Sequence, residues 1–222
     1  MALALVVINK MQKPTIAYWG VRSLAEPIRM LLHHLEVDFE DKYYVFGEEE
    51  WPQDKERLGL DFPNLPYYID DQVKLTESYA IFLYIALKYN PNYLGRTTIE
   101  QAHVNMVYGV LKDIFMPFAL AGYEPDASTR MPMTLDSKRA ALEKVSSYLE
   151  GKRFFNGDQP TYVDFYAHEL IERIEAYSPD YLAAISPNFA AFKTHFRELA
   201  HMDEFLSRLR LKFNLSRAHW GN

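Results

Sequence analysis

The sequence predicts a two-part protein, a small α/β unit followed by an all-helical unit. Runs rich in β-branched and aromatic residues occur in the first third of its 222 residues, whereas the remainder shows the 3.6-residue apolar period of helices. A stretch with Pro91, Gly95 and two threonines separates these two patterns. We therefore expect an N-terminal extension at 1–14, an α/β unit at 15–90, a linker at 91–98 and a helical unit at 99–222.

The first unit is expected to form a small sheet covered by helices, in the order β-α-β and then β-β-α. Two prolines exclude regular structure from residues 61–66. Ser23 and Glu26 have the spacing of a capping box for the first helix. The expected strands are Thr15–Trp19, a run within Phe39–Phe46, Tyr67–Ile69 and Val73–Leu75. The expected helices are Leu24 to Leu35, a short one within Trp51–Leu58, and one after Thr76 that ends near Tyr89.

The second unit is expected to contain five or six helices. The first extends from about Ile99 to Ala121, and a break at residues 122–133 separates it from a second, which Gly151 terminates. Thr161 at the N-cap and Asp164 at N3 predict the start of a third helix. Prolines at 179 and 187 separate the remaining helices, which end near Arg210.

Composition and charge exclude several classes of protein. Lys plus Arg number 24 and Asp plus Glu 30, so the net charge of 24 − 30 = −6 disfavours a nucleic-acid or anionic-membrane partner. The apolar run Ala2–Ile8 is far shorter than the roughly 20 residues of a membrane span and lacks the features of a signal peptide. We therefore expect no membrane span and a cytoplasmic location.

Sulfur and metal chemistry can also be assessed from residue counts. The chain has no cysteine, so any reacting sulfur must arrive on a ligand. The histidines lack the spacing of metal ligands, because His33 and His34 are adjacent and His168 has no second histidine four residues later. We expect neither a metal nor a cofactor.

Several motifs, in the right order, resemble cytosolic glutathione transferases, and most of all the mu class. They are Ala17-Tyr18-Trp19 with Val21-Arg22-Ser23-Leu24, the loop from Leu58 to Tyr67, Leu75-Thr76-Glu77-Ser78, Thr161-Tyr162-Val163-Asp164-Phe165, and the closing Trp220-Gly221-Asn222. The resemblance covers about residues 15 to 222. It implies a thioredoxin-like N-terminal domain, an all-helical C-terminal domain, and transfer of glutathione to small hydrophobic electrophiles.

The resemblance implies that Tyr18 is the catalytic residue. A free thiol has a pKa near 8.5, so only a few per cent is ionised at pH 7. A hydrogen-bond donor aimed at the sulfur stabilises the thiolate, and a tyrosine hydroxyl with a pKa near 10 stays protonated and can donate. Taken alone, Tyr18 would be one of 16 tyrosines, most of which pack in a core.

The other roles are likewise implied by the resemblance. Leu65, before Pro66, would pair with the cysteinyl backbone of glutathione, and Ser78 and Glu77 would bind its γ-glutamyl carboxylate and ammonium. Tyr123 would line the electrophile pocket. Phe62 would insert into a partner subunit, and Asp113 would reach the partner's γ-glutamyl ammonium, so a homodimer is expected. The full set implied for glutathione binding is Trp19, Leu24, Trp51, Lys55, Asn64, Leu65, Glu77, Ser78 and Asp113.

Two departures leave a second function open. Between Gly47 and Trp51 the chain is about six residues shorter than a mu-class loop and lacks its glutathione-binding arginine, and residues 1–12 have no counterpart. These features favour a non-catalytic, glutathione-transferase-like subunit of a larger assembly, with 1–12 docking onto a protein partner. Intact Tyr18 and Ser78 favour the enzyme. Glutathione-dependent isomerase or peroxidase activity would use the same site and stays open as well.

Overall fold

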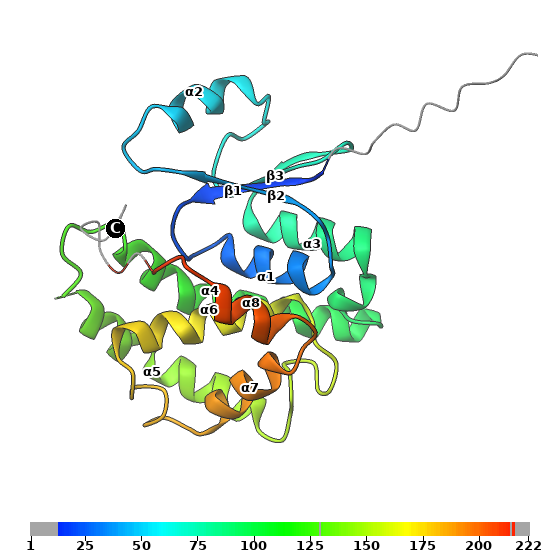
Figure 1. Cartoon of the computed structure of the whole chain (residues 1–222). Helices are drawn as coiled ribbons and strands as arrows, with labels where there is room; N and C mark the ends of the chain where they lie inside the picture. Colours follow the sequence, from blue (N-terminus) through cyan, green and yellow to red (C-terminus); the bar gives the residue numbers. More distant parts are fainter. Residues whose placement is uncertain (1–12, 129, 214, 216–222) are drawn as a thin grey trace, which may run out of the picture.

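The computed structural model describes residues 13–128, 130–213 and 215. Its first part is a four-stranded sheet in the order β2-β1-β3-β4, in which β1 pairs parallel with β2 and antiparallel with β3. Helices α1 and α3 cover one face of this sheet, and α2 lies beyond the other (Figure 1). The strands are β1 Thr15–Trp19, β2 Glu40–Tyr44, β3 Tyr67–Ile69 and β4 Lys74–Thr76, and the helices are α1 Glu26–His34, α2 Glu50–Arg57 and α3 Ser78–Tyr89.

The rest of the described chain is helical. A short 3₁₀ helix, η1 Pro91–Leu94, follows α3 inside the expected linker. The remaining helices are α4 Thr98–Ala121, α5 Arg130–Leu149, α6 Tyr162–Tyr177, α7 Asn188–Arg197 and α8 Met202–Arg208. Thioredoxin-like α/β followed by all-α is therefore the correct fold class, while the exact domain limits stay a prediction.

One apolar core joins the two parts. Leu31 of α1 and Phe82 of α3 lie in the same buried cluster as Phe115 of α4 and Phe165 of α6, and all four side chains are fully buried. Burying such a side chain contributes roughly 1.5–3 kcal/mol relative to exposure. The position of the sheet, and of any site at its edge, is thus fixed by the helical part.

The expected start of α6 is confirmed. Thr161 is the N-cap, and Asp164 forms the capping box with it. The Asp164 carboxylate also accepts from the backbone N–H of Phe155 at 2.9 Å and from the N–H of Thr161 at 2.7 Å. Burial raises the pKa of the Asp164 carboxyl to about 6, against the effect of these hydrogen bonds. This side chain therefore joins the loop before α6 to its first turn.

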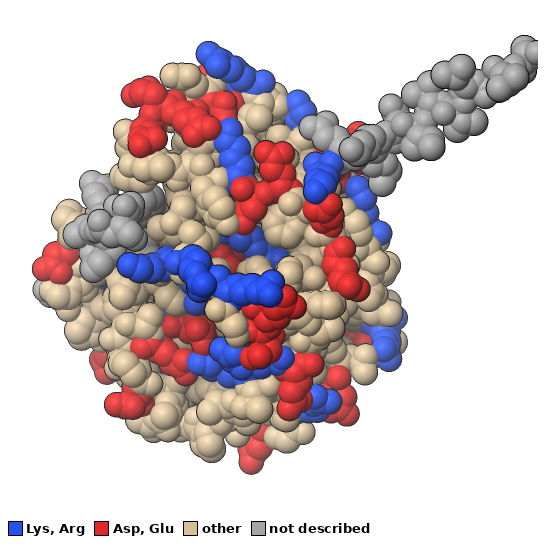
Figure 2. Space-filling view, viewed as in Figure 1, with Lys and Arg blue, Asp and Glu red and all other residues tan. Residues whose placement is uncertain are grey.

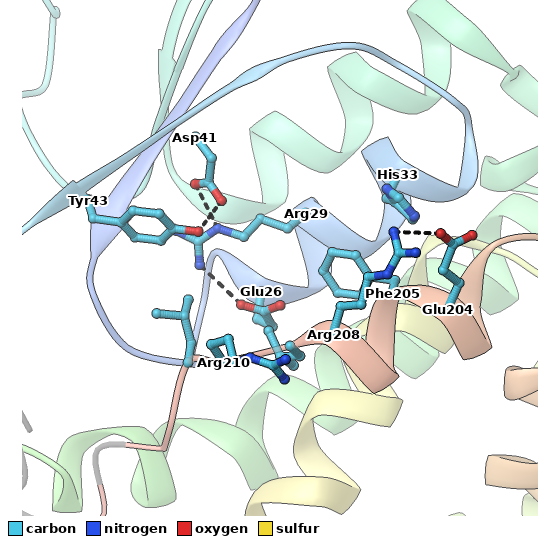
Figure 3. A pocket seen from close by; sticks show the side chains of 11 residues that line it. Glu26, Arg29, His33, Asp41, Tyr43, Glu204, Phe205, Arg208 and Arg210 are labelled. Carbon is cyan, nitrogen blue, oxygen red and sulfur yellow. Dashed lines mark hydrogen bonds and ion pairs between the residues drawn. The ribbon is translucent and has the colours of Figure 1, made fainter.

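The capping box expected at Ser23 and Glu26 is wrong. The first helix begins at Glu26 with Ala25 as its N-cap, and no side chain caps it. Glu26 is instead fully buried, and its carboxylate accepts from Arg29 at 3.2 Å (Figure 3). Sequence spacing could not separate the two outcomes, because Glu26 lies one turn before a buried arginine that needs a partner.

The break between the first two long helices is also shorter than expected. Helix α5 begins at Arg130 rather than after Met133, with Pro132 in its first turn. Proline is tolerated there because the first N–H groups of a helix have no intrahelical partner. The helix therefore starts three residues before the expected end of the break.

Charged side chains of both signs share the surface. On the face shown in Figure 2, Lys and Arg are interspersed with Asp and Glu. Several form exposed pairs, such as Arg197 with Asp203 at 2.7 Å and Arg208 with Glu204 at 2.7 Å. Exposed pairs of this kind contribute little to stability, typically about 0–1 kcal/mol. Stability therefore depends mainly on the core and on the buried pairs.

Candidate active site

Tyr18 lies at the carboxyl end of β1 with its side chain 3 % exposed. Burial raises the pKa of its hydroxyl, and the neighbouring Tyr123 raises it further, whereas a hydrogen bond from Ser23 and the charge of Arg173 lower it. The hydroxyl thus stays protonated across the physiological range. A protonated phenol can donate a hydrogen bond to an anion such as a thiolate.

The loop before β3 contains Leu65 and Pro66, for which glutathione binding stays a prediction. The Leu65–Pro66 bond is cis, and Leu65 is buried. The backbone N–H of Leu65 donates to Asn64 Oδ1 at 2.9 Å. A peptide that pairs with Leu65 would therefore take over this donor from Asn64.

Glu77 and Ser78 lie at the N-terminus of α3, as expected. Glu77 has a left-handed backbone conformation with φ of 66°, and its exposed side chain accepts from Asn64 Nδ2 at 3.4 Å. Ser78 is the first residue of the helix, and its hydroxyl interacts with Tyr108 of α4. Free N–H groups and the helix dipole favour a carboxylate at this end, while Glu77 offers an anion for an ammonium.

Five of the expected residues share a single apolar cluster that includes the end of β1. Tyr18 and Leu65 are buried in this cluster, and Trp19, Leu24 and Trp51 pack against it. Trp51 of α2 lies on Tyr67 with a ring-centroid distance of 6.2 Å and an interplanar angle of 23°. Lys55 lies one turn further along α2 with an exposed side chain. The fold thus brings three separate segments, around residues 18, 51 and 65, to one place.

Tyr123 follows α4 and completes an aromatic group beside Tyr18. Its ring lies 6.4 Å from that of Phe46, and Phe46 lies 5.5 Å from Trp19 in an edge-on arrangement. Phe46 is 39 % exposed, so this group borders solvent. Aromatic walls next to a buried hydroxyl suit a flat apolar ligand. Tyr123 therefore lies beside Phe46 and Tyr18, while its role in binding an electrophile stays a prediction.

Two expected residues lie apart from this group. Phe62 is 79 % exposed in the loop before β3, and Asp113 is exposed on α4. Their expected roles involve a second subunit, which a single chain does not test. Their exposure leaves both side chains available for such a contact.

Sequence patterns missed some residues near the site. Ser23 lies beside the Tyr18 hydroxyl, although its spacing suggested a helix cap. Asp54 of α2 bonds to Lys42 and Tyr44 of β2 at 2.6 and 2.7 Å. No motif marks Asp54, since one acidic residue in a polar helix carries no sequence signal.

A separate cavity of about 370 Å³ lies between α1, β2, α8 and residues 209–211. None of the expected site residues lines it. At its floor Arg29 donates to Asp41 at 2.9 Å and to Glu26, and Tyr43 lies over the guanidinium (Figure 3). This arrangement explains where the buried charge of Arg29 is neutralised.

Across residues 13–128, 130–213 and 215, no three His, Cys, Asp or Glu side chains gather in a way that could hold a metal ion. Helix α4 is long and apolar enough to cross a membrane by length and composition, yet half of its apolar window is buried inside the fold. That burial is typical of a core helix.

The first part of the chain is a thioredoxin-like sheet with a cis proline before β3 and a buried tyrosine in β1. A helical domain follows it, and this combination is that of the glutathione-transferase fold. The family model "Glutathione S-transferase, N-terminal domain" matches residues 14–87, and "Glutathione S-transferase, C-terminal domain" matches residues 111–200. The chain belongs to the glutathione S-transferase family.

Curated relatives and solved structures agree with this assignment. The chain is 36% identical to glutathione S-transferase 2 of Gallus gallus over 86% of this chain and 89% of that one. It is 35% identical to glutathione S-transferase Mu 2 of Homo sapiens over 94% and 98% of the two chains. The crystal structure of the glutathione S-transferase Blo t 8 superposes with a TM-score of 0.75 at 32% identity, covering 87% of this chain and 92% of that one.

Proposed function

We propose that this protein conjugates the thiolate of glutathione to small hydrophobic electrophiles, as its family membership and the site together support. The observation that carries the proposal is the protonated, buried Tyr18 hydroxyl at the edge of the site, beside the aromatic group of Tyr123 and Phe46. Names of curated relatives, which are glutathione S-transferases, point to the same reaction.

The proposed chemistry needs a donor rather than a base at Tyr18. When glutathione binds, its S–H proton leaves to solvent, and the sulfur becomes an anion that accepts a hydrogen bond from the Tyr18 hydroxyl. A charge-assisted bond of this kind lowers the pKa of the bound thiol. The thiolate then attacks the electrophilic carbon, a C–S bond forms, and the leaving group departs with the electron pair of its bond to that carbon. Tyr18 keeps its proton throughout.

Glutathione is proposed to lie across the three segments that meet at the site. Its γ-glutamyl carboxylate would lie at the N–H groups and hydroxyl of Ser78, and its ammonium near Glu77. Its cysteinyl backbone would pair with Leu65, with Asn64 beside it. Its glycyl carboxylate and the neighbouring backbone would lie near Trp19, Trp51 and Lys55, and Leu24 would also contact the tripeptide. Glutathione acts here as co-substrate, and we propose no further cofactor.

The electrophile is proposed to bind against Tyr123, Phe46 and Trp19. The hydroxyl of Tyr123 could polarise a carbonyl or nitro group of this second substrate. The class of activity that fits is detoxification of flat, apolar electrophiles. Isomerase or peroxidase chemistry would use the same thiolate and is separated from conjugation only by testing substrates.

We propose a two-fold symmetric homodimer. Between α4 and α5 lies an apolar pocket of about 190 Å³ whose lining includes Met106, Val110, Lys144 and Tyr148. The exposed ring of Phe62 matches such a pocket in size and chemistry, so Phe62 of one subunit would fill the pocket of its partner. Asp113 would then reach the γ-glutamyl ammonium bound by that partner.

We also propose a cytoplasmic location for the enzyme, as expected in the sequence analysis. Residues 1–12, which lie outside the described residues, are proposed to dock onto a protein partner. A chain starting at Lys13 should then fold, dimerise and bind glutathione as the full chain does, but lose co-purifying proteins. A much lower unfolding temperature of the shortened chain would contradict this proposal.

The test of function combines binding with turnover. The purified protein should bind glutathione in calorimetry and convert chlorodinitrobenzene to its thioether, as followed by absorbance. No finding favours the non-catalytic alternative. That alternative would be supported if glutathione bound and yet no member of a panel of aryl halides, epoxides, enones and peroxides were turned over.

A further inference from the structure

Helix α2 is attached to the rest of the protein in an unusual way. None of its eight residues is fully buried, and only Trp51 and Asp54 are even half-buried. A helix normally binds to its domain through an apolar face, since short isolated helices are marginal in water. The position of α2 must therefore depend strongly on the few contacts that Trp51 and Asp54 make.

Asp54 makes a compact set of hydrogen bonds to the sheet. Its Oδ2 accepts from Lys42 Nζ at 2.6 Å and from the Tyr44 hydroxyl at 2.7 Å. Because the one hydrogen of the Tyr44 hydroxyl is used in the bond to Asp54, the Tyr44 oxygen accepts from the Tyr67 hydroxyl, which lies 3.0 Å away. One carboxylate oxygen of α2 is thus joined to β2 directly and to β3 through Tyr44.

Lys42 and Tyr44 stabilise the negative charge of the Asp54 carboxylate. Hydrogen bonds from Lys42 and Tyr44 lower the pKa of the Asp54 carboxyl, so the group is ionised at neutral pH. The Lys42 ammonium makes two further contacts: it pairs with Glu50 at 3.1 Å, and it lies 4.7 Å from the centre of the Tyr44 ring. Charge-assisted hydrogen bonds are stronger and shorter than neutral ones.

The rings of the same two tyrosines, Tyr44 and Tyr67, also contact Trp51. Its ring lies 5.3 Å from the ring of Tyr44 and stacks at 6.2 Å on that of Tyr67. Trp51 precedes Asp54 by three residues and therefore lies on the same face of α2. Asp54 consequently fixes both the helix and the aromatic surface on which Trp51 rests.

We propose that Asp54 is a positioning residue for the glycyl end of glutathione: its bonds to Lys42 and Tyr44 hold α2 so that Trp51 and Lys55 face the glycyl carboxylate. The inference rests on the proposed function. Asp54 does not contact glutathione in this scheme and acts only through α2. Its loss should therefore weaken recognition of the glycyl group while leaving the thiol and the γ-glutamyl end bound as before.

A substrate that lacks glycine separates this role from a general one. Steady-state kinetics of Asp54→Asn would be compared for glutathione and for γ-glutamylcysteine, with chlorodinitrobenzene held constant. We expect KM for glutathione to rise about tenfold, the size of effect that follows from losing a bond to a charged group. KM for γ-glutamylcysteine should change less than about twofold, and kcat at saturating glutathione should be unchanged.

Control variants on the same network sharpen the comparison. Glu50→Gln removes the other carboxylate that bonds to Lys42, but that side chain is 54 % exposed, so KM for glutathione should stay within about twofold of the wild type. Tyr44→Phe, which removes the hydroxyl between Asp54 and Tyr67, should reproduce the Asp54→Asn pattern. Asp54→Glu, which keeps a carboxylate, should restore part of the affinity.

Hydrogen exchange gives a readout that does not depend on activity. In Asp54→Asn the amides of α2 should exchange faster, whereas those of β1 and α6 should be unchanged. The proposal is overturned if KM rises equally for both thiols, or if exchange in α2 is unaltered. The proposed function itself fails in a different way, because the wild-type protein would then bind neither thiol.

Discussion

Arg22 and Glu169 form a buried ion pair across 147 residues of sequence, with Arg22 Nη2 at 2.7 Å and Nε at 3.2 Å from the same oxygen of Glu169. Arg22 lies in the loop that follows Tyr18, and Glu169 lies in the middle of α6. Arg173 of α6 donates to the backbone carbonyl of Arg22 at 2.8 Å. The loop that follows Tyr18 is thus held by the helical domain.

Glu169→Ala should be strongly destabilising. Glu169 is fully buried and Arg22 is 7 % exposed, so the substitution leaves a buried guanidinium without its main partner. Removing one member of a buried pair typically costs about 3–5 kcal/mol. Urea unfolding at a fixed protein concentration would measure the change. The matched control is Glu143→Ala, which breaks the exposed pair with Arg139 and should cost less than about 1 kcal/mol; equal losses in the two variants would contradict the buried role.

The sequence predicted the elements of this fold well where the signal is local. The strand at Thr15–Trp19, the hairpin around residue 70 and the capping box of Thr161 with Asp164 depend on side-chain alternation, turn residues and cap spacing over a few positions. Each was found within about one or two residues of its expected place, which is the normal uncertainty of element ends.

The site residues near Tyr18 are predicted only by the family resemblance. Patterns of residue type and spacing alone do not distinguish them from other residues. Ser23 was interpreted as a cap because its spacing to Glu26 fits one, but Glu26 pairs with Arg29 in the interior instead. Asp54 carries no motif, and its importance depends on Lys42 and Tyr44, which are brought to it by strand β2. Contacts between distant segments follow from tertiary packing, which single-sequence patterns do not contain.

Tyr18→Phe should keep glutathione binding within a few-fold and lower turnover near neutral pH. The substitution deletes one hydrogen bond to the thiolate, which contributes about 1.5–3 kcal/mol, or roughly ten- to a hundredfold in rate. Turnover should recover as the pH rises, because solvent then ionises the thiol without the donor. Calorimetry and the thiolate absorbance of bound glutathione measure the two effects separately. If binding collapsed while that absorbance was unchanged, Tyr18 would be structural.

Phe62→Ala should weaken the proposed dimer. In a two-fold contact each substitution removes two equivalent interactions. At about 1.5–3 kcal/mol for each buried phenyl ring, the dissociation constant of the dimer should rise roughly 10²- to 10⁴-fold. Activity should fall with it, because Asp113 would no longer reach the neighbouring site.

Sedimentation velocity over a range of concentrations would measure the Phe62→Ala effect. Val45→Ala is the control, since Val45 is an exposed apolar residue (49 %) outside the proposed contact and should leave the dimer intact. A wild-type protein that is a fully active monomer would contradict the dimer proposal.

His168 should make the protein sensitive to acid. Its ring is 1 % exposed and stacks on Phe196 at 4.3 Å, and neither ring nitrogen has a hydrogen-bond partner among the described residues. Burial lowers the pKa of the imidazole to about 3, while Glu172 opposes the shift and Arg22, Lys193 and Arg197 add to it. His168 is therefore neutral in the folded protein at any pH above about 3.

The sign of the pH effect follows from proton binding. In the unfolded chain the imidazole has a pKa near 6.5, so between about pH 6.5 and 3 the unfolded state binds more protons than the folded state. The free energy of unfolding must then decrease as the pH falls through this window. For the two pKa values given, the contribution of His168 lost between pH 7.5 and pH 5 is about 2 kcal/mol.

His168→Phe should remove this part of the acid sensitivity, because phenylalanine keeps the stacking on Phe196 but cannot be protonated. Urea unfolding of both proteins at pH 7.5 and pH 5, at one protein concentration because a dimer is expected, gives two differences to compare. The wild type should lose about 2 kcal/mol more than the variant between these pH values. The remaining titratable groups are the same in both proteins, so their contributions to the pH dependence cancel in the comparison. Equal losses would show that His168 finds a proton-stabilising partner in the fold and is not held neutral by burial.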